Sequence, residues 1–293
     1  MGWTEHNIVA FDVETTGLSP YEGHRIIEFA AVVMPVNTAG ELLEGGIRRH
    51  EFLFDPQMEI PKEVENLTGI TNDQVKGKPK FKEGAQDICA LLDGAITVAH
   101  NFAFDRSHVT HELRRAGLNW PDTLLEVDTL DLSRKFFSTL REHKLGQLSQ
   151  RLGITLVNAH RASADAEACG RCFLTMTRRY EAPPEIGGLT DWSGALGRPP
   201  ATGQIVRGPS GDLVFAGGEW EGEPISQHPG HLAWMQIARR RVDSDWQHRF
   251  PDSLRAWIGR WLRIRGAGRA PSGGKSGSAH EWGLDSIARP ERR

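Results

Sequence analysis

The order of apolar runs over the first 180 residues is the feature that most limits the possible folds. Three strand-like apolar runs come first, and two more follow after segments whose apolar residues have helical spacing. The five runs are residues 7–15, 25–36, 50–54, 95–101 and 124–132. Strands that first form a meander and then alternate with helices predict an α/β domain with a mixed five-stranded sheet flanked by helices.

Helical segments with apolar stripes and glycine stops complete this domain, which we expect to occupy residues 1–182. We expect the helices at residues 62–67, 82–94, 105–117, 144–154 and 164–180. Cys169 and Cys172 lie three residues apart in the last of these helices. Because no further cysteine or histidine follows at metal-ligand spacing, the pair predicts a packed helix face and not a zinc site.

Composition divides the rest of the chain into three parts. Residues 183–204 are rich in proline and predict an irregular linker. Residues 205–262 contain one strand pair and two helical segments, HLAWMQIARRR and DSLRAWIGRWL, which is enough for a small α+β module. Residues 263–293 are rich in glycine, serine and arginine and predict a flexible, disordered basic tail.

Charge is distributed unevenly behind the formal net charge of -3. Residues 1–238 hold 22 Lys and Arg against 32 Asp and Glu, whereas residues 239–293 hold 13 against 6.

No run approaches the roughly 20 apolar residues that a membrane helix needs, and the N-terminus lacks a signal-peptide pattern. Three cysteines are too few for a disulfide framework. We therefore expect a cytoplasmic protein with no membrane partner.

Acidic residues at the ends of predicted elements are the strongest candidates for chemistry. Asp12 and Glu14 lie two apart on a strand, so both face the same side of the sheet. This pair suits either a metal site or a solvated strand end. Asp105 follows an apolar strand and opens a helix, where it is either a helix cap or a ligand. Asp165 lies in the first turn of the last helix, and His160 projects from the loop before it.

Taken together, four carboxylates from three distant segments form the kind of site that two hard divalent cations require. Two Mg²⁺ or Mn²⁺ ions stabilise the attacking and leaving oxygens of an in-line displacement at phosphorus. A histidine beside them is suited to take the proton from the attacking water. The five residues therefore predict a metal-dependent phosphodiester hydrolase.

The segments FDVETTGLSP, VAHNFAFD and HRASAD resemble the three motifs of the DEDDh family of 3'-to-5' exonucleases, the proofreading-exonuclease and RNase T group. The resemblance covers about residues 7–180, and IPKEVENLTGIT is similar to the family's connecting segment. The sister class needs a tyrosine four residues before the last aspartate, where this chain has Arg161. The resemblance implies an RNase H-like sheet.

Roles for individual residues follow from the resemblance alone. It implies that Asp12, Glu14 and Asp165 hold the first metal, that Asp12 and Asp105 hold the second, and that His160 is the general base. It also implies a set of substrate-binding residues. These are Thr15 and Thr16 through their backbone, Leu18 as a wedge against the terminal base, and Asn101 and Phe104 as walls of the pocket. For Leu18 and Phe104, ordinary core packing is an equal alternative.

The segment LVFAGGEWEGEPISQHPGHLAWMQIARRR resembles, more faintly, a small domain behind exonuclease X-like nucleases. The residues that fit are Phe215, Gly217, Gly222, Pro229, Leu232 and Trp234. That pattern has lysines around its glycine turn, whereas this chain has glutamates at 219, 221 and 223. A second surface is the basic run 239–241 with Trp246, His248 and Arg249, since cations track phosphates and aromatic rings stack bases. The alternative is a small tryptophan core solvated by arginines.

Our first hypothesis is a 3'-to-5' exonuclease that releases nucleoside monophosphates from the 3' ends of single strands, with DNA favoured over RNA. A second hypothesis is a catalytically idle nucleic-acid-binding or assembly subunit. A third places the nuclease in a larger polymerase, repair or phage-defence complex. In that case residues 239–293 would contact a protein partner.

Overall fold

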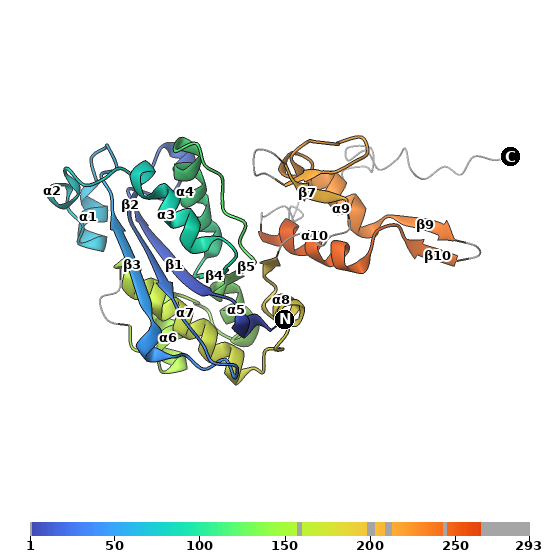
Figure 1. The fold of residues 1–293 in the computed structure, drawn as a ribbon, viewed down its shortest axis with the longest axis horizontal. Helices are drawn as coiled ribbons and strands as arrows, with labels where there is room; N and C mark the ends of the chain where they lie inside the picture. Colours follow the sequence, from blue (N-terminus) through green and yellow to red (C-terminus); the bar gives the residue numbers. More distant parts are fainter. Residues whose placement is uncertain (1, 157–159, 198–202, 209–212, 243–244, 265–293) are drawn as a thin grey trace. The chain divides into compact units, whose positions relative to one another are not determined.

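The computed structural model describes residues 2–156, 160–197, 203–208, 213–242 and 245–264. The chain divides into two compact units, residues 1–198 and 199–293, and each is described by itself (Figure 1).

The first unit is built on a mixed sheet with the strand order β3-β2-β1-β4-β5-β6. The strands are β1 (Ile8–Thr15), β2 (Ile26–Val33), β3 (Arg48–Leu53), β4 (Ile96–Ala99), β5 (Leu125–Asp128) and β6 (Leu196–Gly197). The first three strands form an antiparallel meander, and β4 and β5 run parallel to β1. The predicted α/β class and the mixed five-stranded sheet are confirmed, and the two-residue β6 adds an antiparallel edge to β5.

The fifth strand is shorter than the sequence predicted. It ends at Asp128, and α5 (Thr129–Phe136) begins at the next residue. The Asp128 side chain accepts a hydrogen bond from the backbone N–H of Leu130, which starts the helix. Leu132 then enters the core at helical spacing, whereas a continued strand has no neighbour to pair with there.

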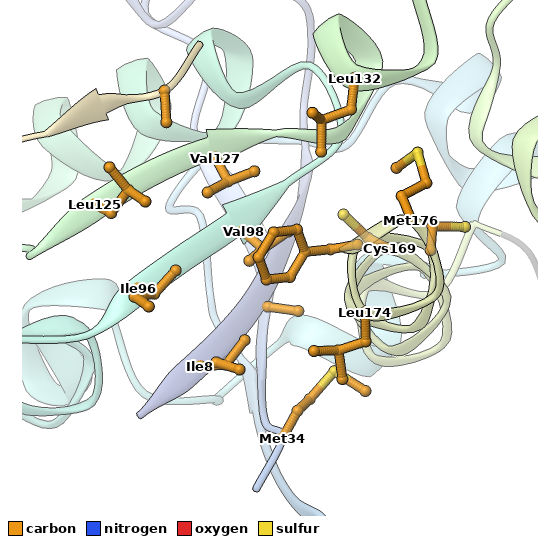
Figure 2. Packing of buried hydrophobic residues seen from close by; sticks show 14 of the residues in the cluster. Ile8, Met34, Ile96, Val98, Leu125, Val127, Leu132, Cys169, Leu174 and Met176 are labelled. Atoms are coloured by element: carbon orange, nitrogen blue, oxygen red, sulfur yellow. The ribbon is translucent and has the colours of Figure 1, made fainter. Parts of the chain in front are cut away.

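Helices cover both faces of the sheet. On one face, α7 (Ala162–Arg179) packs against the even-numbered side chains of β1. Figure 2 shows Ile8 of β1 in one buried cluster with Cys169, Leu174 and Met176 of α7. The predicted packed face of the CxxC pair is confirmed, because both thiols are free and buried. Gly170 allows this close approach, since a Cβ there would lie 2.1 Å from Met34 Sδ.

The opposite face carries α3 (Phe81–Leu92) and α4 (Phe102–Arg115). Their apolar residues Ile88 and Val109 pack with Phe11 and the other odd-numbered side chains of β1. The remaining helices of this unit are α1 (Lys62–Thr68), α2 (Asn72–Val75), α6 (Leu145–Leu152) and α8 (Ile186–Ser193). Within the described parts of the chain, none of the helices has the length and hydropathy of a membrane-spanning segment.

Helix α8 lies where the sequence predicted an irregular linker. It begins directly after the proline pair at 183–184, and Leu189 is fully buried in the core of the first unit. Gly194, with a φ of 67°, ends the helix in the left-handed conformation. The proline content therefore marks the start of the helix and does not make the segment irregular.

The described residues of the second unit form two strand pairs and two α-helices. These elements are β7 (Ile205–Arg207), β8 (Leu213–Phe215), α9 (Pro229–Ile237), β9 (Arg239–Val242), β10 (Asp245–His248) and α10 (Asp252–Ile264). The prediction that one helix continues through residue 241 was wrong. Leu232 and Met235 are buried, but Ile237 is 66% exposed and the arginines after it have no apolar side chain to bury, so the chain leaves the helix and forms a hairpin. The predicted tail, apart from residues 263–264, lies outside the described residues.

Candidate active site

The carboxylates of Asp12 and Glu14 lie on the face of β1 that α7 covers. They continue the even-numbered series that begins with Ile8 and Ala10, which pack into the core beneath α7. Asp165 lies in the first turn of α7. One carboxylate oxygen from each of Asp12, Glu14 and Asp165 lies within 4.8 Å of the others. The fold therefore brings together acids that are 151 residues apart in the sequence.

Asp105 does not cap a helix, which corrects one of the two roles that its position suggested. Helix α4 begins at Phe102, and its N-cap is Asn101, whose φ of 68° is left-handed. Strand β4 pairs with β1 only as far as Ala10. On this side, the rest of β1 has no neighbouring strand among the described residues. There the Asp105 Oδ1 atom accepts a hydrogen bond of 3.1 Å from the Val13 N–H. Asp105 is buried next to Asp12 but lies outside the three-carboxylate group.

Burial and mutual repulsion raise the pKa of these acids. The pKa of Asp12 is raised well above its usual value, first by burial and then by the neighbouring carboxylates of Asp105, Glu14 and Asp165. Burial and the charge of Asp165 raise the pKa of Glu14 to about 8. Burial also raises the pKa of Asp165. Carboxylates crowded in this way need a cation if they are to be ionised together at neutral pH.

His160 lies outside α7, as predicted, and next to the carboxylates. Its backbone N–H donates a hydrogen bond of 2.9 Å to Asp165 Oδ2. Its φ of 66° is left-handed, a conformation that is uncommon for residues other than glycine but less so for histidine and asparagine. The side chain is exposed, so the imidazole is accessible to water and substrate.

The turn that carries His160 is held by Glu28, a residue that the sequence did not single out. Glu28 lies on β2 directly opposite Glu14 and is 3% exposed. Its carboxylate accepts hydrogen bonds from Arg161 Nη2 at 2.6 Å, from Arg161 Nε at 3.2 Å and from the Ala162 N–H at 3.0 Å. Glu28 thus caps the N-terminus of α7 and fixes the backbone on which His160 and Asp165 lie. An acid in an otherwise apolar strand was the only signal in the sequence.

We expect Glu28→Gln to slow catalysis about tenfold while leaving the KM for an oligonucleotide within about twofold, because residues that orient ligands typically contribute 10–100-fold. The amide keeps the size of the side chain, but its NH₂ group opposes the Arg161 guanidinium. Steady-state kinetics on a 3' single strand would measure both constants. Glu44→Gln is the control, since Glu44 pairs with Arg171 in an exposed bridge. A lowered melting temperature with unchanged kcat would show that Glu28 is only structural.

Asp128 is a second acid whose role only the structure shows. Its Oδ1 atom accepts from the Asn101 N–H at 3.0 Å and the Leu130 N–H at 2.9 Å, and its Oδ2 atom accepts from the Phe102 N–H at 3.1 Å. One carboxylate therefore caps both α4 and α5. It fixes the residue at which α4 begins and thereby the position of Asp105 in its first turn. Burial raises the pKa of Asp128 to about 6.

The residues expected to contact substrate differ in exposure. Thr15 and Thr16 are buried, and the Thr16 hydroxyl accepts a hydrogen bond of 2.9 Å from the Arg25 N–H, which closes the turn after β1. Leu18 is 85% exposed, which excludes core packing for this residue. Phe104 is half-buried with its ring 4.5 Å from that of His108, so it belongs partly to the core. Asn101 is exposed.

Comparison with known proteins assigns the family. Residues 9–173, more than half of the chain, match the model of the RNase T exonuclease family. The chain belongs to this family. The resemblance inferred from the three motifs is thereby confirmed, and the first unit is an exonuclease domain of the hydrolase class.

Curated relatives are similar over this domain only. The 3'-5' exonuclease DinG of Bacillus subtilis is 39% identical over 180 residues, 61% of this chain and 18% of that protein. The PolC-type DNA polymerase III of Halalkalibacterium halodurans is 36% identical over 174 residues, 59% of this chain and 12% of that protein. The chain thus spans less than a fifth of the length of these relatives.

Solved structures of exonuclease I share the fold. One has a TM-score of 0.52 at 20% sequence identity and covers 64% of this chain and 43% of that chain. The Escherichia coli enzyme in complex with a dT13 oligonucleotide has a TM-score of 0.52 at 21% identity, covering 60% of this chain and 42% of that one. At this identity the likeness extends to the fold alone.

Proposed function

We propose that this chain is a metal-dependent exonuclease that removes nucleoside monophosphates from the 3' end of single-stranded nucleic acid, with DNA favoured. The observation that carries the proposal is the group of three carboxylates from β1 and α7 within 4.8 Å, with the backbone N–H of His160 donating a hydrogen bond to Asp165. The DinG relative is a 3'-5' exonuclease, and the exonuclease I structure contains bound oligothymidylate.

The donor set fits hard divalent cations. All of the groups are carboxylates, the ligands that Mg²⁺ and Mn²⁺ prefer, and burial together with their mutual repulsion raises the pKa values of Asp12 and Glu14. Asp12, Glu14 and Asp165 would hold one ion, and Asp12 and Asp105 a second. When bound, two such ions stabilise the attacking and leaving oxygens of an in-line displacement at phosphorus.

The chain's own residues would perform the remaining steps. The His160 imidazole takes a proton from the attacking water, and solvent can remove that proton because the side chain is exposed. The water oxygen bonds to phosphorus as the bond to the 3' oxygen of the preceding nucleotide breaks, and that oxygen takes up a proton. The products are a nucleoside 5'-monophosphate and a strand one residue shorter. Leu18, exposed beside the site, would wedge against the terminal base, and Thr15, Thr16, Asn101 and Phe104 would form its pocket.

A panel of 5'-labelled single- and double-stranded DNA and RNA, incubated with Mg²⁺, Mn²⁺ or EDTA, tests the proposal. We expect a ladder that shortens from the 3' end of single strands, at a rate at least about 10³-fold lower in EDTA. Endonucleolytic fragments would contradict the polarity. Binding without degradation under every condition would favour the idle-subunit hypothesis. The cytoplasmic location and a protein partner for residues 239–293 remain predictions.

A further inference from the structure

Four lysines alternate along the segment that runs from α2 to the start of α3, two elements of the first unit that Figure 1 labels. This lysine strip consists of Lys76, Lys78, Lys80 and Lys82. The first unit is acidic overall, with 21 Lys and Arg against 28 Asp and Glu in residues 1–198, yet residues 74–82 contain no acid. Lys76, Lys78 and Lys82 are exposed, and no ion pair to any of the four is formed by the residues that the structure describes. The strip is therefore a run of positive charge without ion pairs among the described residues, bounded by Asp73 and by Glu83, whose carboxylate accepts a hydrogen bond of 2.9 Å from the Lys80 N–H.

The strip is fastened to the segment that follows β3. Pro79, in the middle of the strip, accepts a hydrogen bond of 2.9 Å at its carbonyl oxygen from the Asp55 N–H. Phe81 packs against Phe54, with the ring centroids 5.0 Å apart and both side chains buried. These contacts give the lysines a fixed base, although their side chains extend into solvent.

The segment after β3 lies at the same end of the strands as the candidate site. Leu53, the last residue of β3, pairs with Glu28, and Glu28 pairs with Glu14. Beyond these strands, Arg25 Nη1 donates a hydrogen bond of 3.1 Å to the Pro56 carbonyl. The Thr16 hydroxyl, two residues past Glu14, donates one of 3.5 Å to Met58 Sδ. A short series of contacts thus connects the strip to the end of β1.

Exposed apolar side chains lie on the loops that follow β1 and β3 at this end of the strands. Leu18 is 85% exposed, Tyr21 is 81% exposed and Met58 is 40% exposed. Tyr21 is supported by an edge contact with His111 at 4.5 Å. Lysines and exposed aromatic and aliphatic groups on connected segments match a single strand, whose phosphates need cations and whose bases need apolar or aromatic surfaces. An acidic protein surface would use the lysines but leave these side chains without a partner.

We propose that the lysine strip binds backbone phosphates of the substrate strand on the 5' side of the nucleotide that is removed. This inference rests on the proposed exonuclease function and adds the path of the strand to it. The strip would add positive charge to a catalytic unit that is acidic overall. It would also lower the KM for strands long enough to reach it.

The test compares Lys76→Ser/Lys78→Ser with the matched pair Arg48→Ser/Arg178→Ser in the full chain. Arg48 begins β3 and Arg178 lies in the last turn of α7. The control therefore removes two charges at the end of the strands that is opposite the candidate site. The substrates are a 20-residue oligothymidylate and the p-nitrophenyl ester of thymidine 5'-monophosphate, which has no upstream phosphate. Melting temperatures verify that all of the variants are folded.

We expect the lysine variant to raise the KM for the oligonucleotide about tenfold and to leave turnover of the ester unchanged. For this variant, the slope of log affinity against log salt concentration should be less steep by about 1.4. Each phosphate contact on a single strand contributes about 0.7 to that slope, and two contacts are removed. An unchanged KM and salt slope, equal losses on both substrates, or an equal effect of the control pair would each overturn the proposal. Ester hydrolysis by the unsubstituted chain reports the catalytic centre alone, so the proposed function can survive failure of the strip.

Discussion

Asp12→Asn is expected to reduce exonuclease activity by at least about 10³-fold and, at the same time, to stabilise the metal-free protein. The activity falls because Asp12 is the one carboxylate assigned to both cations, and a neutral amide is a poor ligand for hard ions. Such a loss corresponds to about 4 kcal/mol of transition-state stabilisation. Degradation of a 5'-labelled single strand in Mg²⁺ or Mn²⁺ measures it.

The gain in stability follows from the sign of the pKa shifts. Because the folded protein raises the pKa of Asp12 and Glu14, ionising them lowers the free energy of unfolding. The stability that their protonated forms contribute is complete below the pKa values of the unfolded chain, which are near about 4. It is lost as the pH rises through the pKa of the folded protein, which is about 8 for Glu14. Removing one charge relieves this repulsion.

The melting temperature in EDTA should therefore be about 2–4 °C higher for Asp12→Asn than for the parent at pH 8, and the difference should shrink toward pH 5. Added Mn²⁺ should raise the melting temperature of the parent more than that of the variant. Asp87→Asn, an exposed acid on α3, serves as the control and should change neither quantity. A variant that melts below the parent at pH 8 would show that the carboxylates are not crowded in solution.

His160→Asn is expected to lower kcat by 10²–10⁴-fold, the usual contribution of a general base. Asparagine is chosen because it tolerates the left-handed backbone that His160 adopts, so the loss reports the imidazole and not a strained turn. The backbone N–H that donates to Asp165 is retained in this variant. Single-turnover rates on a short oligonucleotide measure the effect.

A second measurement distinguishes a general base from a structural histidine. The melting-temperature increase that Mn²⁺ produces should be unchanged in His160→Asn, because Asp12, Glu14 and Asp165 are all present. A variant with a parent-like rate would exclude His160 from the reaction.

Most of the fold could be predicted because its signals are local. The even-numbered acids of β1, the glycine stops and the amphipathic stripe of α7 depend on residues close together in the chain. The errors occurred where local signals compete. The strand predicted over 124–132 ends at Asp128 because that side chain caps α5. The helix predicted through residue 241 ends at Ile237, and residues 239–242 pair with 245–248 in a hairpin instead. Neither boundary could be read from apolar spacing alone.

The sequence by itself determined the chemistry of this protein: the acids at the ends of β1, α4 and α7, the histidine before α7, and the family to which they belong. Only the tertiary structure decided how these groups meet. It brings Asp12, Glu14 and Asp165 within 4.8 Å, turns Asp105 onto the Val13 N–H, and gives the N-terminus of α7 a cap from Glu28. Contacts between residues about 90 to 150 positions apart are set by packing of the whole sheet, and packing leaves no periodic trace in the sequence.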